Sequence, residues 1–141
     1  MRLEIKGIPM AKQSMKVTRS GIKYRDPKVT REENNIRSQV IQQLPKGFKP
    51  FTGPIFQQVT FFFPFNKHLS RAEKEIVKRG DPLFKSTKPD RDNLLKLLND
   101  ALEGIIFIND SQVCGGAVSK VYDNKPMTVI EIQEFYNLEG Q

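Results

Sequence analysis

Apolar and polar residues alternate in four segments of the chain, with the period of a β-strand that has one buried face. The first segment is residues 1–8 and the second is residues 54–65. Two more, residues 117–123 and 127–135, flank Asp123-Asn124, which we interpret as a hairpin turn. The alternation therefore predicts a sheet of about four strands.

Two helices are predicted from their capping residues. Asp26-Pro27 is typical of a helix start, and apolar residues then recur every four positions until Pro45 ends the pattern. A capping-box pattern at residues 70–73 opens a short charged helix that ends near Gly80.

A third helix is predicted from Asp92 to about Ile106, because its apolar residues fill one broad arc at the helical period. This apolar side is expected to pin the helix to the core, and the polar side faces outward. The apolar arc consists of Leu94, Leu95, Leu97, Leu98, Ala101, Leu102, Ile105 and Ile106. The polar arc consists of Asp92, Asn93, Lys96, Asn99, Asp100 and Glu103.

The order of these elements predicts an α+β fold, with one mixed sheet and its helices packed against it. The length of 141 residues fits a single domain spanning residues 1–141. Between the first strand and the first helix, residues 9–25 form a basic loop with a turn at Ser20-Gly21.

The charge is uneven along the chain. Its formal net charge is +7, yet residues 90–141 hold only 4 basic residues against 9 acidic ones. The remaining part, residues 1–89, is therefore strongly basic. A basic excess favours nucleic acid as the partner, although a solvated surface is the equally weighted alternative.

The lone Cys114 cannot form an internal disulfide, and we expect it to be a small packing residue rather than a nucleophile. No apolar run reaches the length of about 18 residues that a membrane span needs, and no signal-peptide core is found. We therefore expect a cytoplasmic protein without a membrane partner.

Three aspartates flank the third predicted helix, Asp90 and Asp92 at its start and Asp110 after its end. Lys96 lies one turn into the helix, on the same side as Asp92. Carboxylate oxygens are the ligands that Mg²⁺ prefers, and a polyanionic substrate needs basic surroundings. The cluster therefore predicts a metal-dependent nuclease, on the condition that Asp110 returns to the start of the helix.

Each acidic residue also has a simpler interpretation. A carboxylate before a helix commonly caps it, which is the favoured interpretation of Asp90 or Asp92 taken alone. One carboxylate suffices for a cap, however, and two repel each other unless a cation or a proton neutralises them. We expect Asp100 and Glu103 on the solvated helix face, with Asp100 a candidate for the outer shell of a metal site. His68 is expected to have no catalytic role.

In this region the chain resembles the RusA family of Holliday-junction resolvases, small phage and prophage endodeoxyribonucleases. The family pattern is Asp-x-Asp-Asn-Leu-x-Lys, then Asp-Ala-Leu, then Asp-Asp-x-Gln-Val. Three linked submotifs in this order within residues 88–113 are far more specific than an isolated Asp-x-Asp. Here they read Asp90-Arg91-Asp92-Asn93-Leu94-Leu95-Lys96, Asp100-Ala101-Leu102 and Asn109-Asp110-Ser111-Gln112-Val113.

The resemblance implies a homodimer that resolves four-way DNA junctions by paired symmetric nicks in recombination and repair. It implies that Asp90, Asp92 and Asp110 hold Mg²⁺, for which Mn²⁺ would substitute, and that Lys96 is the essential basic residue. No small-molecule cofactor is expected. The residues expected to bind DNA are Lys12, Lys16, Arg19, Lys23, Arg25, Lys88 and Arg91.

The chain departs from the family pattern in two places. Asn109 replaces the first aspartate of the Asp-Asp pair, and residues 12–16 are less arginine-rich than the family's basic loop. Residues 66–86 look like an insertion relative to the most compact members. The alternatives are a non-catalytic basic DNA-binding protein of phage or prophage origin and a structural interaction protein. The former would bind DNA without nicking it, and the latter would show no salt-sensitive DNA binding.

Overall fold

The computed structural model describes residues 1–12 and 15–137, so Gln13 and Ser14 of the basic loop lie outside the described residues. No helix in these ranges is long and apolar enough to cross a membrane. The elements are β1 (Arg2–Lys6), β2 (Lys16–Val17), β3 (Lys23–Tyr24), α1 (Pro27–Gln43), β4 (Ile55–Pro64), α2 (Arg71–Lys78), α3 (Arg91–Leu102), a 3₁₀ turn η1 (Asp110–Gln112), β5 (Val113–Asp123) and β6 (Met127–Glu134).

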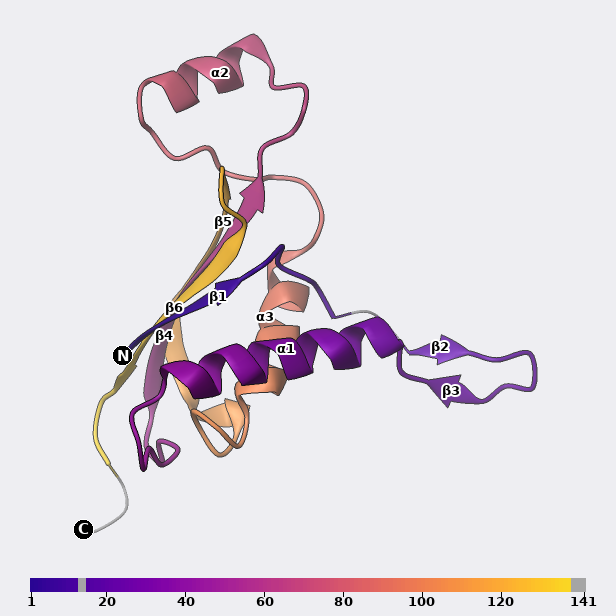
Figure 1. Ribbon diagram of the computed structural model, residues 1–141, viewed down its shortest axis with the longest axis vertical. Helices are drawn as coiled ribbons and strands as arrows, with labels where there is room; N and C mark the ends of the chain where they lie inside the picture. The colour runs from indigo at the N-terminus through magenta and orange to yellow at the C-terminus, as the bar shows by residue number, and fades with distance from the viewer. Residues whose placement is uncertain (13–14, 138–141) are drawn as a thin grey trace.

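Four strands form one mixed sheet in the order β1-β6-β4-β5, and α1 and α3 pack against one of its faces (Figure 1). This is the α+β fold that the sequence predicts. β4 pairs in parallel with β5 and antiparallel with β6, so it lies between them. The hairpin predicted at Asp123-Asn124 is therefore wrong. Alternation identifies a strand and its buried face, but it carries no information on which strand lies beside it.

One apolar cluster joins the helices to the sheet. Alternate residues of β4 are buried in it, including Val59, Phe61 and Phe63, as the period of two predicts. The apolar side of α3 is buried as well, although the helix ends at Leu102 and not at Ile106. Asn99, which the sequence places on the polar side, is also buried. The buried residues of α3 are Leu94, Leu97, Leu98, Asn99, Ala101 and Leu102.

Both predicted helix starts are confirmed. Asp26 caps α1, accepting a hydrogen bond from the Lys28 backbone N–H at 2.9 Å. This bond, together with the nearby Lys16 ammonium, lowers the pKa of the Asp26 carboxyl. The predicted capping box opens α2 at residues 70–73. Because a cap depends on residues only two or three positions apart, it can be read from the sequence.

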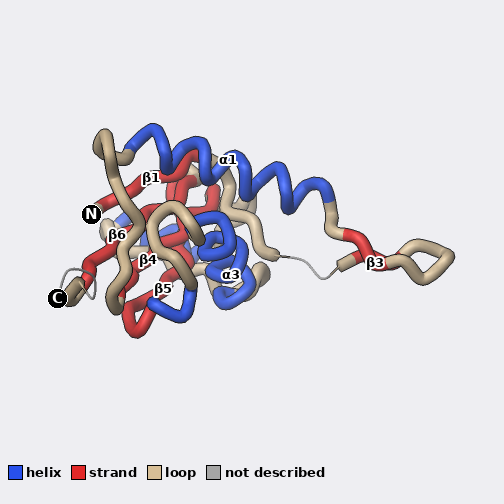
Figure 2. Tube along the Cα trace, turned by 90° about the horizontal axis from the view of Figure 1, so that it is seen from below, coloured by secondary structure: helices blue, strands red, loops and turns tan. Residues whose placement is uncertain are grey.

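The basic loop contains regular structure that the sequence did not predict. β2 and β3 pair antiparallel and form a hairpin, which projects beyond the start of α1 and away from the sheet (Figures 1 and 2). The predicted turn is confirmed at its tip. There Gly21 has a φ of +84°, and the Thr18 N–H donates to the Ile22 carbonyl at 2.8 Å.

Residues 66–86, the expected insertion, leave the sheet after β4 and carry α2 at one end of the molecule (Figure 1). The segment returns along β5, where the Lys85 N–H donates to the Lys120 carbonyl at 2.9 Å. The Tyr122 N–H donates to the Leu83 carbonyl at the same distance. These bonds cover the outer edge of β5 near its end.

The two edges of the sheet differ in how they are protected. Along β1, the side chains of α1 take the place of a strand, because Gln43 accepts from the Glu4 N–H at 2.9 Å and Gln39 from the Lys6 N–H at 2.8 Å. Along β5, residues 113–119 have no outer backbone partner within the described part of the chain. An open strand edge is a template for pairing with another strand.

Candidate active site

Asp90 and Asp92 lie together at the start of α3. Asp90 is the N-cap residue, with a φ of −69° and a ψ of 143°, yet its side chain makes no capping hydrogen bond. Asp92 lies in the first turn, and Lys96 follows one turn later. All three side chains are exposed. The capping interpretation of Asp90 is therefore wrong, and the carboxylates face solvent.

Buried polar contacts hold the far half of α3 in place. Gln57 of β4 donates to the Asn99 side-chain oxygen at 2.7 Å inside the core. Arg37 of α1 donates to the backbone carbonyls of Asp100 and Ala101, each at 3.1 Å. Carbonyls in the last turn of a helix otherwise lack partners. These bonds fix the axis of the helix that carries Asp90 and Asp92, and rigid support is what metal ligands require.

Lys120 fixes the loop that precedes Asp90. Its ammonium group, on β5, donates to the backbone carbonyls of Thr87 and Pro89, each at 2.7 Å. Hydrogen bonds from a charged donor are about twice as strong as neutral ones. The residue immediately before Asp90 is therefore tied to the sheet. Sequence reasoning missed this role, since nothing in the strand pattern indicates which carbonyls a lysine will reach.

Replacing Lys120 by methionine is expected to lower the free energy of unfolding by about 1–3 kcal/mol, because two charge-assisted hydrogen bonds are lost while the aliphatic stem is kept. Urea unfolding followed by circular dichroism measures the change. Lys125→Met, at an exposed position after β5, is the control and is expected to change stability by less than about 0.5 kcal/mol. Equal stability of the two variants would contradict this role of Lys120.

Asp110 lies beyond the other end of α3. Its backbone N–H donates to the Glu103 carboxylate at 3.2 Å, and Glu103 is the C-cap residue of that helix. Glu103 was predicted to be merely solvated. Asn109, the departure from the family pattern, caps the η1 turn by accepting from the Ser111 N–H at 2.9 Å. Asn109 therefore stabilises the turn that presents Asp110.

Gln112 is the centre of this turn. Its side-chain oxygen accepts from the Ile108 and Asn109 N–H groups at 2.8 and 2.9 Å. Its side-chain nitrogen donates to the carbonyls of Phe51 and Gly53 at 2.8 and 3.1 Å. The glutamine of the third submotif thus has a structural role that its place in the pattern did not reveal.

One chain does not bring Asp110 to Asp90 and Asp92. The two groups lie at opposite ends of α3, whose 12 residues span about 18 Å. Within residues 1–12 and 15–137, no three Asp, Glu, His or Cys side chains lie close enough to hold one metal ion. The return of Asp110 to the helix start, on which the sequence-based prediction depended, is therefore not found within a single chain.

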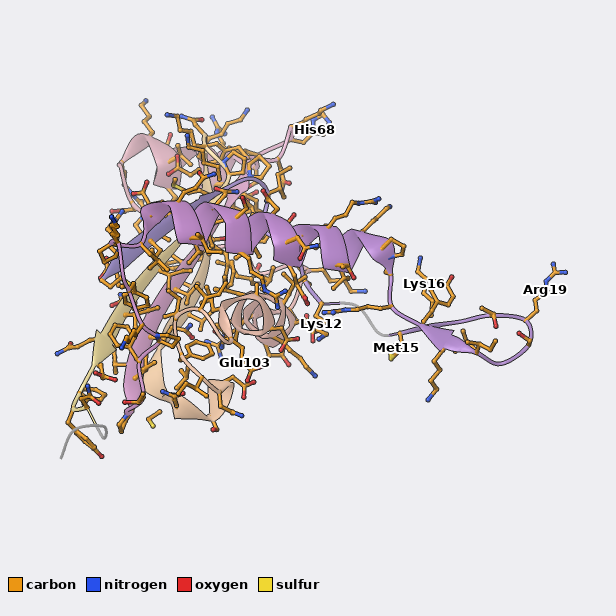
Figure 3. The ribbon with its side chains drawn as sticks, turned by 60° about the horizontal axis from the view of Figure 1, so that its bottom comes forward. Lys12, Met15, Lys16, Arg19, His68 and Glu103 are labelled. Atoms are coloured by element: carbon orange, nitrogen blue, oxygen red, sulfur yellow. The ribbon has the colours of Figure 1, made fainter. Side chains whose placement is uncertain are left out.

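The cations of the basic loop fall into two groups. Those at its base make ion pairs with the body, whereas Arg19 lies at the outer end of the hairpin (Figure 3). Arg19 and Lys23 are both exposed. The pairs at the base are Lys12 with Asp100, Lys16 with Asp26, and Arg25 with Glu33. Asp100 is therefore engaged with Lys12.

Positive charge also surrounds the start of α3. Lys88 and Arg91 are exposed on either side of Asp90. Lys85, in the loop before them, lies with its ammonium 5.1 Å from the centre of the Tyr122 ring. Burial acts to raise the pKa of the Tyr122 phenol, but hydrogen bonds with Thr87 and Lys85 outweigh it and lower that pKa. These cations exceed what the nearby carboxylates require, so the region around the start of α3 suits a polyanionic ligand.

Two other predicted residues can be placed. Cys114 is exposed and its thiol donates to the Gln112 carbonyl at 3.3 Å, so it is not the small packing residue that the sequence predicted. His68 is exposed in the loop before α2 (Figure 3), in the polar setting that the sequence indicated.

Comparison with known proteins gives a family match and a similar protein. A family model described as "Endodeoxyribonuclease RusA" matches residues 6–133, most of the chain. A relative from Bacillus subtilis (strain 168), described as "Uncharacterized protein YqaN", is 38% identical over 84 residues. This alignment covers 59% of the present chain and 59% of the relative, so the chain spans less than two thirds of that protein.

Proposed function

The chain belongs to the RusA endodeoxyribonuclease family, and we propose that it is a metal-dependent nuclease that resolves Holliday junctions by paired symmetric nicks. The observation that carries the proposal is the pair of exposed carboxylates at the start of α3. Asp90 stands at the N-cap without capping, and Asp92 follows two residues later. An N-cap carboxylate that makes no capping bond, beside a second exposed carboxylate, is available to bind a cation.

The donor set fits a hard divalent cation. Asp90 and Asp92 supply carboxylate oxygens, which Mg²⁺ and Mn²⁺ prefer, and Asp110 would supply a third. When bound, the ion would lower the pKa of a coordinated water and neutralise charge at the scissile phosphate. The residues of the chain supply the rigid frame, through the core side of α3 and the hydrogen bonds of Lys120.

Lys96 has its own role in this proposal. It lies four residues after Asp92, so both point from the same side of α3. Its ammonium would hold the scissile phosphate and offset the charge that develops as the P–O bond breaks. Lys88 and Arg91 would contact the neighbouring phosphates. These contacts position the backbone, and they carry no sequence preference of their own.

Because Asp110 is remote within one chain, we propose that the active unit is a homodimer whose two copies complete each other's sites. The open edge of β5, residues 113–119, is the surface we assign to this contact. Two such strands can pair antiparallel across a two-fold axis near Gly116, the centre of this edge, and two-fold symmetry is the commonest symmetry of soluble oligomers.

The direction of β5 supports this arrangement. The strand starts just after Asp110 and reaches Lys120, whose ammonium holds the carbonyl before Asp90. Antiparallel pairing reverses the strand, so the partner's Asp110 would approach the end of this β5 and therefore Asp90. An extended segment of residues 113–120 spans about 24 Å, comparable to the separation along α3 that has to be bridged.

The proposed substrate is a four-way DNA junction, whose approximate two-fold symmetry matches a dimer with two sites. The basic loop would contact phosphates of the junction arms, chiefly through Arg19 and Lys23 in its outer part. Lys12, Lys16 and Arg25 would contribute less, because each is paired with a carboxylate at the base of the loop. If about six phosphates are neutralised, the logarithm of the affinity should fall with the logarithm of salt concentration at a slope of about −5.

The test is incubation of the purified full chain with a labelled four-way junction and with a linear duplex of matched length, in Mg²⁺, Mn²⁺ or EDTA. Paired symmetric nicks in the junction, present with metal and absent with EDTA, are expected. Junction binding without nicking in either metal would overturn the nuclease assignment in favour of a non-catalytic DNA-binding protein. Equal nicking of the duplex would overturn the selectivity for junctions.

A further inference from the structure

The β2–β3 hairpin exposes apolar side chains that the fold does not explain. Ile22 is 63% exposed, Val17 59%, Met15 56% and Tyr24 41%. An isolated two-stranded hairpin is only marginally stable in water, so it usually needs a surface to pack on. Figures 1 and 2 show this hairpin extending away from the sheet and its helices. The apolar residues therefore stand where a partner can reach them.

The base of the hairpin is anchored, and its outer end is not. The ion pair of Lys16 with Asp26, at 3.1 Å, and that of Arg25 with Glu33 tie both strands to the start of α1. Asp26 and Glu33 are themselves buried, so each pair is held by a fixed carboxylate. The hairpin therefore has a defined direction relative to the body, while its tip, residues 18–22, is exposed.

The charge of the hairpin identifies the kind of partner. Residues 15–25 contain four basic residues and no acidic one. Arg19 and Lys23 lie close in sequence to Ile22, so cations and an apolar side chain share one end of the ribbon. A polyanion with accessible apolar surface matches this combination. Nucleic acid with exposed base faces has both properties, and a two-stranded ribbon fits the major groove.

We propose that the hairpin reads the branch point of DNA, with Ile22 as an apolar wedge against base faces at the crossover and Arg19 and Lys23 on the flanking phosphates. This inference rests on the proposed junction substrate. Inserting an aliphatic side chain into continuous duplex requires unstacking of a base step, which costs free energy. Where stacking is already interrupted this cost is smaller. The wedge therefore favours branched over linear DNA.

The test compares Ile22→Ser with Ile41→Ser, a matched control on α1 whose side chain is 57% exposed. Affinity for a four-way junction and for linear duplex is measured by fluorescence anisotropy in EDTA, so that binding is separated from nicking. Ile22→Ser is expected to weaken junction binding about tenfold and duplex binding less than twofold, since serine removes the apolar contact with the base faces that are accessible at the branch point. Ile41→Ser should change neither.

Two further measurements separate the wedge from other roles. Fluorescence of 2-aminopurine at the branch point is expected to rise on binding of the unaltered chain and not on binding of Ile22→Ser. Arg19→Gln should instead weaken binding to both DNAs and reduce the salt slope by about one. Loss of dimer mass in Ile22→Ser, measured by sedimentation, would overturn the inference by assigning the hairpin to a second copy of the chain.

The outcomes distinguish this inference from the proposed function. If the unaltered chain binds junction and duplex equally well, the junction substrate fails and the inference fails with it. If the unaltered chain prefers the junction and Ile22→Ser retains the full preference, only the inference about the hairpin is overturned.

Discussion

Asp92→Asn is expected to slow nicking of a four-way junction by about 100-fold or more, while affinity for the junction is retained or rises. The amide keeps the size of the side chain but removes the charge that would hold the divalent ion, and with it the electrostatic stabilisation of the reaction. Binding is retained because removing a negative charge beside phosphates reduces repulsion. Single-turnover nicking in Mg²⁺ and anisotropy in EDTA measure the two effects.

Glu75→Gln is the matched control, because it removes one negative charge from the exposed surface of α2. Its nicking rate is expected to stay within about twofold of the unaltered chain, as is usual for surface substitutions. A loss of nicking in Asp92→Asn accompanied by an equal loss of junction binding would mean that Asp92 acts in folding or binding and not at a metal site.

Mixing two inactive variants is expected to restore nicking if the sites are shared between copies. In a heterodimer of Asp92→Asn with Asp110→Asn, one site carries both substitutions and the other carries neither. With random exchange of subunits about half of the dimers are heterodimers, so about a quarter of the sites regain activity. These dimers should release singly nicked junctions, because each has one working site. Denaturing gels of the labelled strands measure both results.

The control for this experiment is a mixture of Asp90→Asn with Asp92→Asn. Both substitutions lie in the same half of the proposed shared site, so every dimer has two damaged sites and nicking should stay absent. If the Asp92→Asn and Asp110→Asn mixture also stays inactive after tagged subunits are shown to have exchanged, the three aspartates do not form a site across two copies.

The sequence predicted the parts of this fold that depend on near neighbours. The caps at Asp26 and Ser70, the turn near Gly21 and the buried side of β4 were all confirmed, since each depends on spacing over a few residues. The apolar side of α3 was likewise confirmed, although the helix is shorter than predicted.

Predictions that needed a partner from elsewhere in the chain were less successful. β4 lies between β5 and β6, so these two strands do not form the predicted hairpin. Asn99, predicted on the polar side of α3, is buried and accepts a hydrogen bond from Gln57. The contacts of Lys120, Gln112 and Glu103 with the loops around α3 were not predicted either. Each of these contacts joins groups whose proximity is set by packing, so no local pattern indicates it.

For the candidate site, the sequence alone determined which side chains are candidates for the chemistry and that Asp90 and Asp92 lie at the start of a helix whose apolar side is buried. Only the tertiary structure decided that Asp110 lies at the other end of that helix and that residues 113–119 of β5 have no outer strand partner among residues 1–12 and 15–137. The physical reason for this difference is that the helical period depends only on residues a few positions apart in the chain, so it can be read from the sequence. The distance between two ends of a helix, and the strand that borders a sheet, are fixed by the packing of the whole chain.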